Sequence, residues 1–505
     1  MTAVDESVQV GHTSLLNRAT SGESPLYIDG GWQPSSDGRT FVDLDVTTRS
    51  QWSVAADGTV EDMDAAIAAA TAAQPAWEAL LPNERAAHLY RAAQVLEDNQ
   101  EYYVDALIKE SGSTRGKSEW ECWLTAIALR EAAALTSRTL GETYPSTVPG
   151  KRNYVERTAA GVVGVISPWN SPLYLSARGF IYAVALGNTA VVKPSEETPV
   201  TGGALLAELF EAAGFPSGIL NVVSCSRDRV EAVADKLIKD FRVKRVCFTG
   251  STAVGRKIGE ACASVLKRAI LEMGGKNPIL VLDDADVDYA VHVAYYSAFL
   301  HQGQICMSCD KVIVAESLYQ TFVDKLVAKA SELKPLDPAN PESVIGPIIN
   351  DRQLERMERL IRAAESAGAD ILVGGTVKGA YYTPTVITGV TPDMEIYHEE
   401  IFGPATMVFR AKDETEAIQI ANDTRYGLSA AVVTSDTSHG QVVARQIDAG
   451  MVHINDSCVH DEPHCPFGGM KDSGWVGKWG GAGAVEAFTE QRWISVQDSP
   501  RDFPF

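Results

Sequence analysis

The chain has 505 residues, of which 45% are hydrophobic and 22% are charged, and its 44 Lys and Arg against 66 Asp and Glu leave a formal charge of −22. This length predicts about three domains, since roughly 150 residues per domain is typical. The acidic balance, with no basic stripe, argues against a nucleic-acid partner, because such affinity rests on Lys and Arg that neutralise phosphates. The first residues contain no apolar core of signal-peptide length, and no apolar run is long enough to cross a bilayer. We therefore expect neither export nor a membrane anchor.

Cysteine usage indicates the compartment. Eight cysteines are scattered along the chain, and Cys306 and Cys309 alone have a C-x-x-C spacing. No further Cys or His set nearby completes a zinc site, so no metal is expected. A large chain with no export signal is expected to keep its thiols reduced, which favours a cytoplasmic location.

The N-terminal third predicts an arm followed by helices. Residues 1–24 are polar and rich in Ser and Thr, which is typical of a loose arm. Ala-rich segments with helical periodicity follow from Thr59, where Thr59 and Asp62 fit a capping box.

A different pattern begins at Gly161. Short apolar runs bounded by Gly and Pro alternate with helical stretches, which is typical of strands buried on both faces of a parallel, doubly wound sheet. The second half of the chain repeats the alternation, and the last block ends in a strand-like segment that we expect to pair across a subunit contact. The first five runs are GVVGVISPW, NTAVVKP, ILNVVS, VKRVCFTG and RAILEMGG.

Several strand ends carry residues that can do chemistry, although each alone has an ordinary structural explanation. The Phe248–Gly255 turn opens a helix, where backbone N–H groups can meet a pyrophosphate, but it matches neither a Walker loop nor G-x-G-x-x-G. Cys306 alone is more often a small buried hydrophobe than a nucleophile. Glu272, before a Gly-Gly turn, and Asn170, after the first strand, are commonly cap or turn residues.

The combination is far more specific than its parts, because ligand crevices of open α/β sheets lie at the carboxyl ends of the strands. The ordered set resembles the aldehyde dehydrogenase superfamily over about residues 26–497, and within it the vanillin and benzaldehyde dehydrogenase branch. The residues that carry the resemblance are Asn170, Lys193, Glu196, Thr249–Gly255, Glu272, Cys306, Glu400-Ile401-Phe402-Gly403-Pro404 and Pro466–Gly474.

The resemblance implies an α/β fold with two doubly wound Rossmann-like domains and a small β oligomerisation flap. It also implies a homodimer or a dimer of dimers, assembled through the flap. The expected parts are a loose arm at 1–24, an NAD-binding domain at 25–143 and 161–274, an oligomerisation segment at 144–160 and 488–505, and a catalytic domain at 275–487.

The resemblance also implies catalytic roles. The Cys306 thiolate would attack an aldehyde carbonyl, and the Asn170 amide with the Cys306 backbone N–H would stabilise the oxyanion. Hydride would then pass to the nicotinamide, leaving a thioester. Glu272 matches the general base that activates water to release the carboxylic acid.

The cofactor implied is NAD, with NADP as an alternative. Lys193 and Glu196 match the positions that hold the adenosine ribose, where a carboxylate repels a 2′-phosphate, although Lys193 softens that preference. The implied cofactor contacts are Ile166, Trp169, Lys193, Ser195, Glu196, Thr249, Gly250, Ser251, Gly255, Glu400 and Phe402.

The substrate implied is an aromatic aldehyde, because Gln302–Ser308 and Asn455–His464 are similar to the vanillin and benzaldehyde branch. A flat apolar substrate predicts an apolar and aromatic pocket. Arg178 and His460 could bond a ring hydroxyl or carboxylate, while an ion pair at a helix surface is an equal alternative for Arg178. The apolar candidates are Tyr174, Leu300, Val459 and Phe467.

One departure bears on the mechanism. Many relatives carry a second acidic residue after the last Ser-Gly, and here Trp479 takes that place. Glu272 is then the only plausible base for deacylation.

Three other functions compete with this interpretation. A coenzyme-A-acylating aldehyde dehydrogenase is disfavoured by Glu272, and a non-catalytic scaffold by the joint presence of Cys306, Asn170 and Glu272. A thioesterase-like hydrolase would leave the nucleotide-binding set unexplained.

Overall fold

The structure is a computed structural model that describes residues 22–138, 141–475 and 477–505. Most of the expected arm at 1–24 lies outside the described residues. Its last two residues are not loose, because β1 (Glu23–Ser24) pairs in parallel with β5 (Gln51–Ala56).

The first large sheet has eight strands in the order β24-β12-β11-β8-β9-β10-β2-β3, and the five from β12 to β10 run parallel. The five apolar runs predicted from the sequence form these five strands. Each is almost wholly buried, as expected where helices cover both faces of a parallel sheet. The bounds are β24 (Gly474–Trp475), β12 (Arg268–Glu272), β11 (Val243–Thr249), β8 (Val162–Ile166), β9 (Thr189–Lys193), β10 (Leu220–Val222), β2 (Leu26–Ile28) and β3 (Gly31–Gln33).

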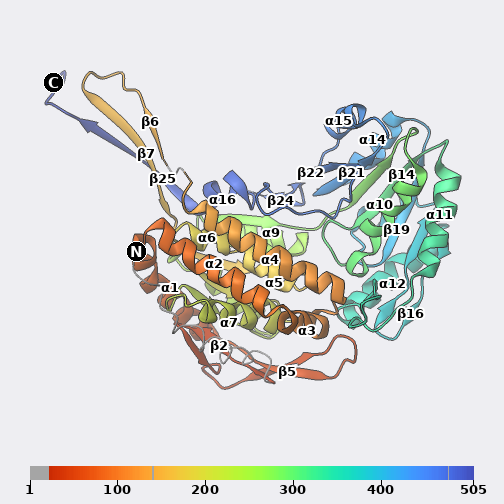
Figure 1. The fold of residues 1–505 in the computed structure, drawn as a ribbon, viewed down its shortest axis with the longest axis horizontal. Coiled ribbons are helices and arrows are strands. Elements are labelled where there is room, and N and C mark those ends of the chain that lie inside the picture. The colour runs from red at the N-terminus through yellow and green to blue at the C-terminus, as the bar shows by residue number, and fades with distance from the viewer. Residues whose placement is uncertain (1–21, 139–140, 476) are drawn as a thin grey trace.

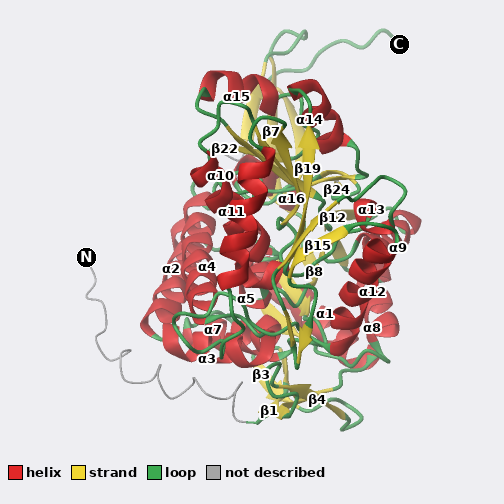
Figure 2. Cartoon of the chain, turned by 90° about the vertical axis from the view of Figure 1, so that its right-hand side faces the viewer, coloured by secondary structure: helices red, strands yellow, loops and turns green. Residues whose placement is uncertain are grey.

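Helices cover this sheet on two sides, and Figure 2 shows the two layers. One layer packs around a core that includes Leu237 and Ile258, and comprises α1 (Val60–Ala79), α8 (Val230–Lys239) and α9 (Thr252–Ser264). The other layer comprises α2 (Pro82–Asp98), α3 (Gln100–Ser111), α4 (Arg115–Leu135), α5 (Pro172–Arg178), α6 (Ile181–Ala185) and α7 (Leu205–Ala212). The predicted capping box is present at the start of α1, where the Thr59 side chain and the Asp62 side chain each bond the other's backbone N–H.

The second large sheet has seven strands in the order β15-β18-β19-β14-β13-β21-β22, all parallel except β15. Its strands are β15 (Asp370–Val373), β18 (Thr385–Thr388), β19 (Ala405–Ala411), β14 (Cys309–Ala315), β13 (Asn277–Val281), β21 (Ser429–Val433) and β22 (Met451–Ile454). Its helices are α10 (Val287–Phe299), α11 (Tyr319–Glu332), α12 (Asp351–Ser366), α14 (Glu414–Asn422) and α15 (Thr437–Ala444).

A three-stranded antiparallel flap projects from the body of the molecule and carries the C-terminus (Figure 1). The C-terminal strand, β25 (Thr489–Gln497), pairs along its whole length with β7 (Lys151–Ala159) of the same chain. The third strand, β6 (Gly141–Tyr144), begins before the expected oligomerisation segment at 144–160.

One connection between the halves of the molecule was not anticipated. The two-residue strand β24 comes from the segment expected in the catalytic domain, yet it pairs antiparallel with β12, placing Gly474 beside Glu272. A strand this short has no hydrophobic periodicity, so its partner depends on tertiary contacts alone.

Candidate active site

The carboxyl ends of β8, β11 and β12 meet segments of the second half of the chain around one cavity of about 340 Å³. Nine of the residues singled out in the sequence line this cavity: six lie at the carboxyl ends of β8, β11 and β12, as the strand-end argument requires, and three precede β14 and β19. They are Trp169, Asn170, Thr249, Gly250, Ser251, Glu272, Cys306, Glu400 and Phe402.

The loop that carries Cys306 is anchored by two buried glutamines. Gln302 Oε1 accepts a hydrogen bond from the Gly346 N–H at 3.0 Å, and Gln304 Oε1 accepts one from the Ile349 N–H at 3.1 Å. Both side chains are completely buried. These two hydrogen bonds hold the loop against the segment 346–349, while Cys306 itself stays partly exposed to the cavity.

The backbone leading to Cys306 is strained. His301 and Gln302 have φ values of 48° and 44°, a left-handed conformation that non-glycine residues rarely adopt. Gly303 follows with φ 68°, and a Cβ there would lie 2.0 Å from the Gly403 carbonyl oxygen. Backbone strain of this kind persists only where the surroundings fix it, and it clusters at functional sites.

Glu272, the last residue of β12, is completely buried and faces the same cavity as Cys306. Neither of its carboxyl oxygens has a hydrogen-bond partner among the described residues. Burial raises the pKa of Glu272 to about 7, although the nearby Arg178 guanidinium, 3.8 Å away, acts to lower it. A buried carboxylate with free oxygens and a pKa near neutrality has the properties of a general base.

Asn170 follows β8 and is 4% exposed. Its Nδ2 donates to the Gln304 carbonyl oxygen at 3.0 Å, which ties it to the loop of Cys306. An amide nitrogen carries two hydrogens, so this bond leaves a second one for the cavity.

The surroundings of the Cys306 thiol disfavour its ionised form. Burial, with the charge of Glu272 next in importance, raises the pKa of the thiol well above its ordinary value. Because the thiolate is the nucleophile, the thiol must lose its proton before it can attack.

Glu400 and the turn after β12 form the far wall of the cavity. The Gly275 N–H donates to Glu400 Oε1 at 3.0 Å, and burial raises the pKa of Glu400 to about 8. A Cβ on Gly274 would lie 2.5 Å from Glu400 Oε2, so glycine is required for this approach. Phe402, with φ 56°, packs edge-on against Trp169 with ring centroids 5.3 Å apart.

The turn expected to bind the nucleotide lies at the N-terminus of α9. Ser251 caps this helix by accepting from the Val254 N–H, and the Gly250 N–H donates to the Glu272 carbonyl oxygen at 3.1 Å. Gly255 lies one turn further on, where a Cβ would meet Met273 Sδ at 2.3 Å. The absence of a Cβ at Gly255 therefore lets α9 pack closely against Met273.

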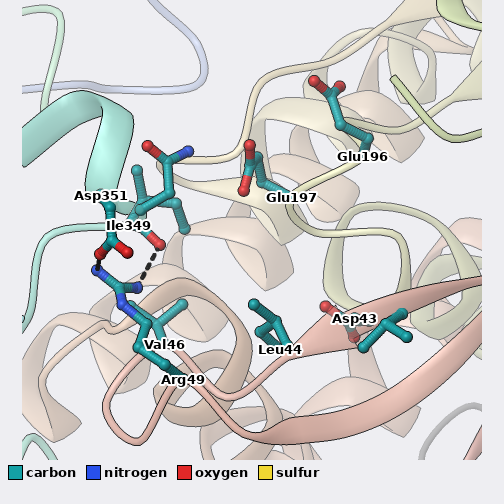
Figure 3. A pocket seen from close by; sticks show the side chains of 10 residues that line it. Asp43, Leu44, Val46, Arg49, Glu196, Glu197, Ile349 and Asp351 are labelled. Atoms are coloured by element: carbon teal, nitrogen blue, oxygen red, sulfur yellow. Dashed lines mark hydrogen bonds and ion pairs between the residues drawn. The ribbon is translucent and has the colours of Figure 1, made fainter. Parts of the chain in front are cut away.

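Four other expected cofactor residues lie beside the cavity lining, at the ends of β8 and β9. Ile166 and Lys193 are buried, and Lys193 Nζ donates to the Pro194 carbonyl oxygen at 2.9 Å. Ser195 Oγ accepts from the Glu197 N–H. Glu196 lines a separate hollow of about 140 Å³ with Asp43, Glu197 and Arg49 (Figure 3), and its carboxylate lies 3.7 Å from the Arg227 guanidinium.

Arg178 is buried among aromatic rings, and the surface ion pair considered as an alternative is not what forms. Its guanidinium pairs with Asp461 at 3.0 Å and lies 4.1 Å from the Phe467 ring centroid. The Tyr174 hydroxyl donates to the same Asp461 carboxylate at 2.9 Å. Three expected pocket residues therefore form one cluster within reach of Glu272.

The other three expected pocket residues are less closely associated with this cluster. Leu300 packs against the hydrophobic core at the start of η3 (Leu300–Gly303), and Val459 is buried. His460 Nε2 lies 3.1 Å from Glu462, and its ring lines a second hollow that Phe467 also borders.

Trp479 is 2% exposed and pairs through its backbone with Phe467. The Arg178 guanidinium lies 5.0 Å from its ring centroid. At the position where a second carboxylate was expected to be missing, the Trp479 ring therefore packs against Arg178, whose guanidinium lies 3.8 Å from Glu272.

The sequence motifs did not reveal several residues of the site. Arg352, Gln353 and Arg356 line the cavity from the first turns of α12, and Arg356 donates to the Glu400 and Ile401 carbonyl oxygens. Asp461 lies in the segment 455–464, but no sequence pattern singles it out as a partner of Arg178. The α12 residues look like the solvated face of an amphipathic helix, so nothing local identifies them.

A cysteine, a buried carboxylate and an amide around one cavity, beside a glycine-containing turn at a helix N-terminus, are typical of a cysteine-dependent oxidoreductase. The chain matches the model of the aldehyde dehydrogenase family over residues 32–494. It therefore belongs to the aldehyde dehydrogenase family, as the motifs and the fold indicated.

Individual relatives are similar over nearly the whole chain. Vanillin dehydrogenase of Corynebacterium glutamicum is 44% identical over 474 residues, which cover 94% of this chain and 97% of that protein. Benzaldehyde dehydrogenase (NAD+) of Pseudomonas putida is 42% identical over 445 residues, covering 88% and 91%. The crystal structure of a salicylaldehyde dehydrogenase from Pseudomonas putida G7, complexed with salicylaldehyde, matches with a TM-score of 0.93 at 37% identity, covering 96% of this chain and all of that one.

In the part of the chain that the structure describes, we find no helix that combines the length and the apolar character needed to cross a membrane.

Proposed function

We propose that this protein oxidises aromatic aldehydes to carboxylic acids with NAD as the hydride acceptor, through a covalent intermediate on Cys306. The observation that carries the proposal is the convergence of Cys306, Glu272 and Asn170 on the cavity that the nucleotide-binding turn also lines.

The residues present fit a dinucleotide. The N-terminus of the thirteen-residue helix α9 borders the cavity, where backbone N–H groups and the helix dipole favour a pyrophosphate. Glu400 is a half-buried carboxyl suited to ribose hydroxyls, and Phe402 would pack near the nicotinamide ring. NAD supplies the hydride acceptor when it is bound.

The first chemical step forms a bond between Cys306 Sγ and the aldehyde carbon. The thiol gives up its proton to water, the sulfur bonds to the carbon, and the carbonyl electron pair moves onto oxygen. The second Asn170 Nδ2 hydrogen and the Cys306 backbone N–H donate to that oxyanion. Collapse of the thiohemiacetal expels hydride and leaves a thioester.

The second step releases the acid. Glu272 removes a proton from water, the resulting oxygen attacks the thioester carbon, and the carbon–sulfur bond breaks to regenerate Cys306. No second carboxylate stands at Trp479, so this work falls to Glu272.

Two features support the choice of cofactor and substrate. Glu196 puts a carboxylate where a 2′-phosphate would be repelled, which favours NAD over NADP, and one relative carries NAD+ in its name. The cluster of Tyr174, Phe467 and Arg178 packs aromatic rings around one cation within reach of Glu272, and the relatives are named for benzaldehyde, vanillin and salicylaldehyde.

An aldehyde panel tests this proposal. We expect NADH release from benzaldehyde and hydroxylated benzaldehydes with kcat/KM about tenfold or more above that for short aliphatic aldehydes, because the rings bury more apolar surface. The measurement is NADH absorbance under initial-rate conditions, with NADP in parallel. Equal activity on propanal, or turnover that requires coenzyme A, would contradict it.

We also propose that the flap, made of β6, β7 and β25, assembles the protein into a homodimer or a dimer of dimers. It projects from the body, and Trp493 and Tyr144 on it are 69% and 51% exposed. An extended sheet with exposed aromatic rings is typical of a surface that another subunit covers.

Shortening the flap tests its role. Truncation after Gln491 removes most of β25, so we expect loss of the oligomer in light scattering coupled to gel filtration. Trp493→Glu is the milder variant, and Phe503→Glu, beyond the strand, is its control. An intact oligomer in both flap variants would show that assembly uses another surface.

A cytoplasmic location remains part of the proposal. All eight cysteines are free thiols, six of them buried, with Cys306 partly buried and Cys465 exposed. This pattern suits a reducing compartment.

A further inference from the structure

A buried ion pair contacts the backbone of Asn170. Lys117 and Glu121, one turn apart on α4, form it, and both side chains are 0% exposed. Neither residue belongs to a motif, and neither lines the cavity. Replacing a buried ion pair by apolar side chains is often neutral or stabilising, so the pair calls for an explanation other than fold stability.

The pair holds the backbone on both sides of Ser171. Lys117 Nζ donates to the Asn170 carbonyl oxygen at 2.9 Å, and Glu121 Oε1 accepts from the Tyr174 N–H at 3.1 Å. Ser171 is the N-cap residue of α5, yet its side chain makes no capping hydrogen bond. Glu121 therefore supplies from another helix the acceptor that this helix start lacks.

The fixed segment carries one group that lines the cavity and one that belongs to the aromatic cluster. Asn170 presents its amide to the cavity, while Tyr174 belongs to the aromatic cluster. The side chain of Asn170 is held from the other side by its bond to the Gln304 carbonyl oxygen. Its backbone and side chain thus have separate anchors, and the ion pair is the anchor of the backbone.

We propose that Lys117 and Glu121 are positioning residues that fix Asn170 and the start of α5 for oxyanion stabilisation. This inference rests on the proposed function, because it assigns the pair's effect to the Asn170 amide. A displacement of about 1 Å at such a donor can cost roughly a hundredfold in rate.

The test is a mutant cycle on the acylation half of the reaction. The variant Lys117→Met with Glu121→Gln removes both charges at similar size, and the amide oxygen introduced at position 121 can still accept from the Tyr174 N–H. We expect the single-turnover rate of NADH formation to fall about tenfold to a hundredfold. The dissociation constant for NAD, measured by fluorescence quenching, should change less than about twofold, because the nucleotide-binding turn is untouched.

The cycle separates positioning from general structure. In an Asn170→Ala background the same double substitution should lower the rate by less than about threefold, since interacting residues give non-additive effects. The control is Arg130→Gln, a substitution elsewhere on α4 that breaks the exposed ion pair of Arg130 with Glu97 of α2. It should leave the rate unchanged. If the double variant does not fold, Lys117→Arg, which keeps the charge, takes its place in the cycle.

The outcomes distinguish this inference from the function on which it rests. An Asn170→Ala enzyme with a normal acylation rate would overturn the oxyanion role of Asn170. An impaired Asn170→Ala enzyme in which the pair's effect is fully additive, or a double variant with a normal rate, would overturn only the positioning role.

Discussion

Cys306→Ala should abolish aldehyde oxidation, with kcat lowered by roughly 10⁴-fold or more, because the variant has no nucleophile to form the thiohemiacetal. The structure gives this residue no substitute. Cys309 is fully buried and its thiol pKa is raised well above the ordinary value, chiefly by burial, while Cys465 is exposed and borders a different hollow. Steady-state and single-turnover NADH release both report the loss.

The matched control is Cys465→Ser, which removes a thiol outside the cavity and should retain native turnover. Cys306→Ala should also bind NAD with native affinity, since the nucleotide-binding turn does not depend on the sulfur. Residual turnover within about tenfold of native would mean that hydride transfer needs no covalent intermediate, and the proposed mechanism would have to be abandoned.

The strand ends could be predicted because buried parallel strands leave a strong local pattern. Runs such as GVVGVISPW are continuous and apolar, and the residues that follow them must meet at one edge of the sheet. This argument predicts that Asn170, Glu272 and the turn from Thr249 lie together at that edge, and all three line the cavity. Family resemblance then assigned roles that the pattern alone left open.

The remaining parts of the site depend on contacts between distant segments. Arg352 and Arg356 belong to a helix that looks solvated in sequence, yet its first turns border the cavity. The sequence around Arg178 does not indicate that its side chain is buried, because its ion-pair partner Asp461 lies 283 residues away. The packing of Gly255 against Met273, where no Cβ would fit, also depends on a contact that the turn sequence does not indicate.

Lys117 and Glu121 show the same limit most clearly. An i,i+4 pair of opposite charges on a helix ordinarily indicates an exposed face. Here the pair is fully buried because α4 packs against α5 just where Asn170 needs an anchor. Charge spacing therefore predicts pairing, while only the packing of the two helices reveals what the pair holds.

Glu272→Gln should separate the two halves of the reaction, leaving a burst of about one NADH per active site followed by steady-state turnover lowered roughly a hundredfold. The amide keeps the size of the side chain, so substrate and cofactor can still bind and hydride can still leave the thiohemiacetal. It cannot take a proton from water, and Trp479 stands where another carboxylate could have replaced it. Stopped-flow absorbance of NADH measures both phases.

The pH dependence supplies a second readout of the same residue. Burial raises the pKa of Glu272 to about 7, and only the ionised form accepts a proton, so native kcat should fall as the pH drops through 7. The Glu272→Gln variant should lose this limb of the profile. Glu400→Gln is the matched comparison, since Glu400 is a second carboxyl that lines this cavity, with a pKa raised to about 8. It should weaken NAD binding and slow both phases together, without a burst. A Glu272→Gln enzyme with normal steady-state turnover would reassign deacylation to a group other than Glu272.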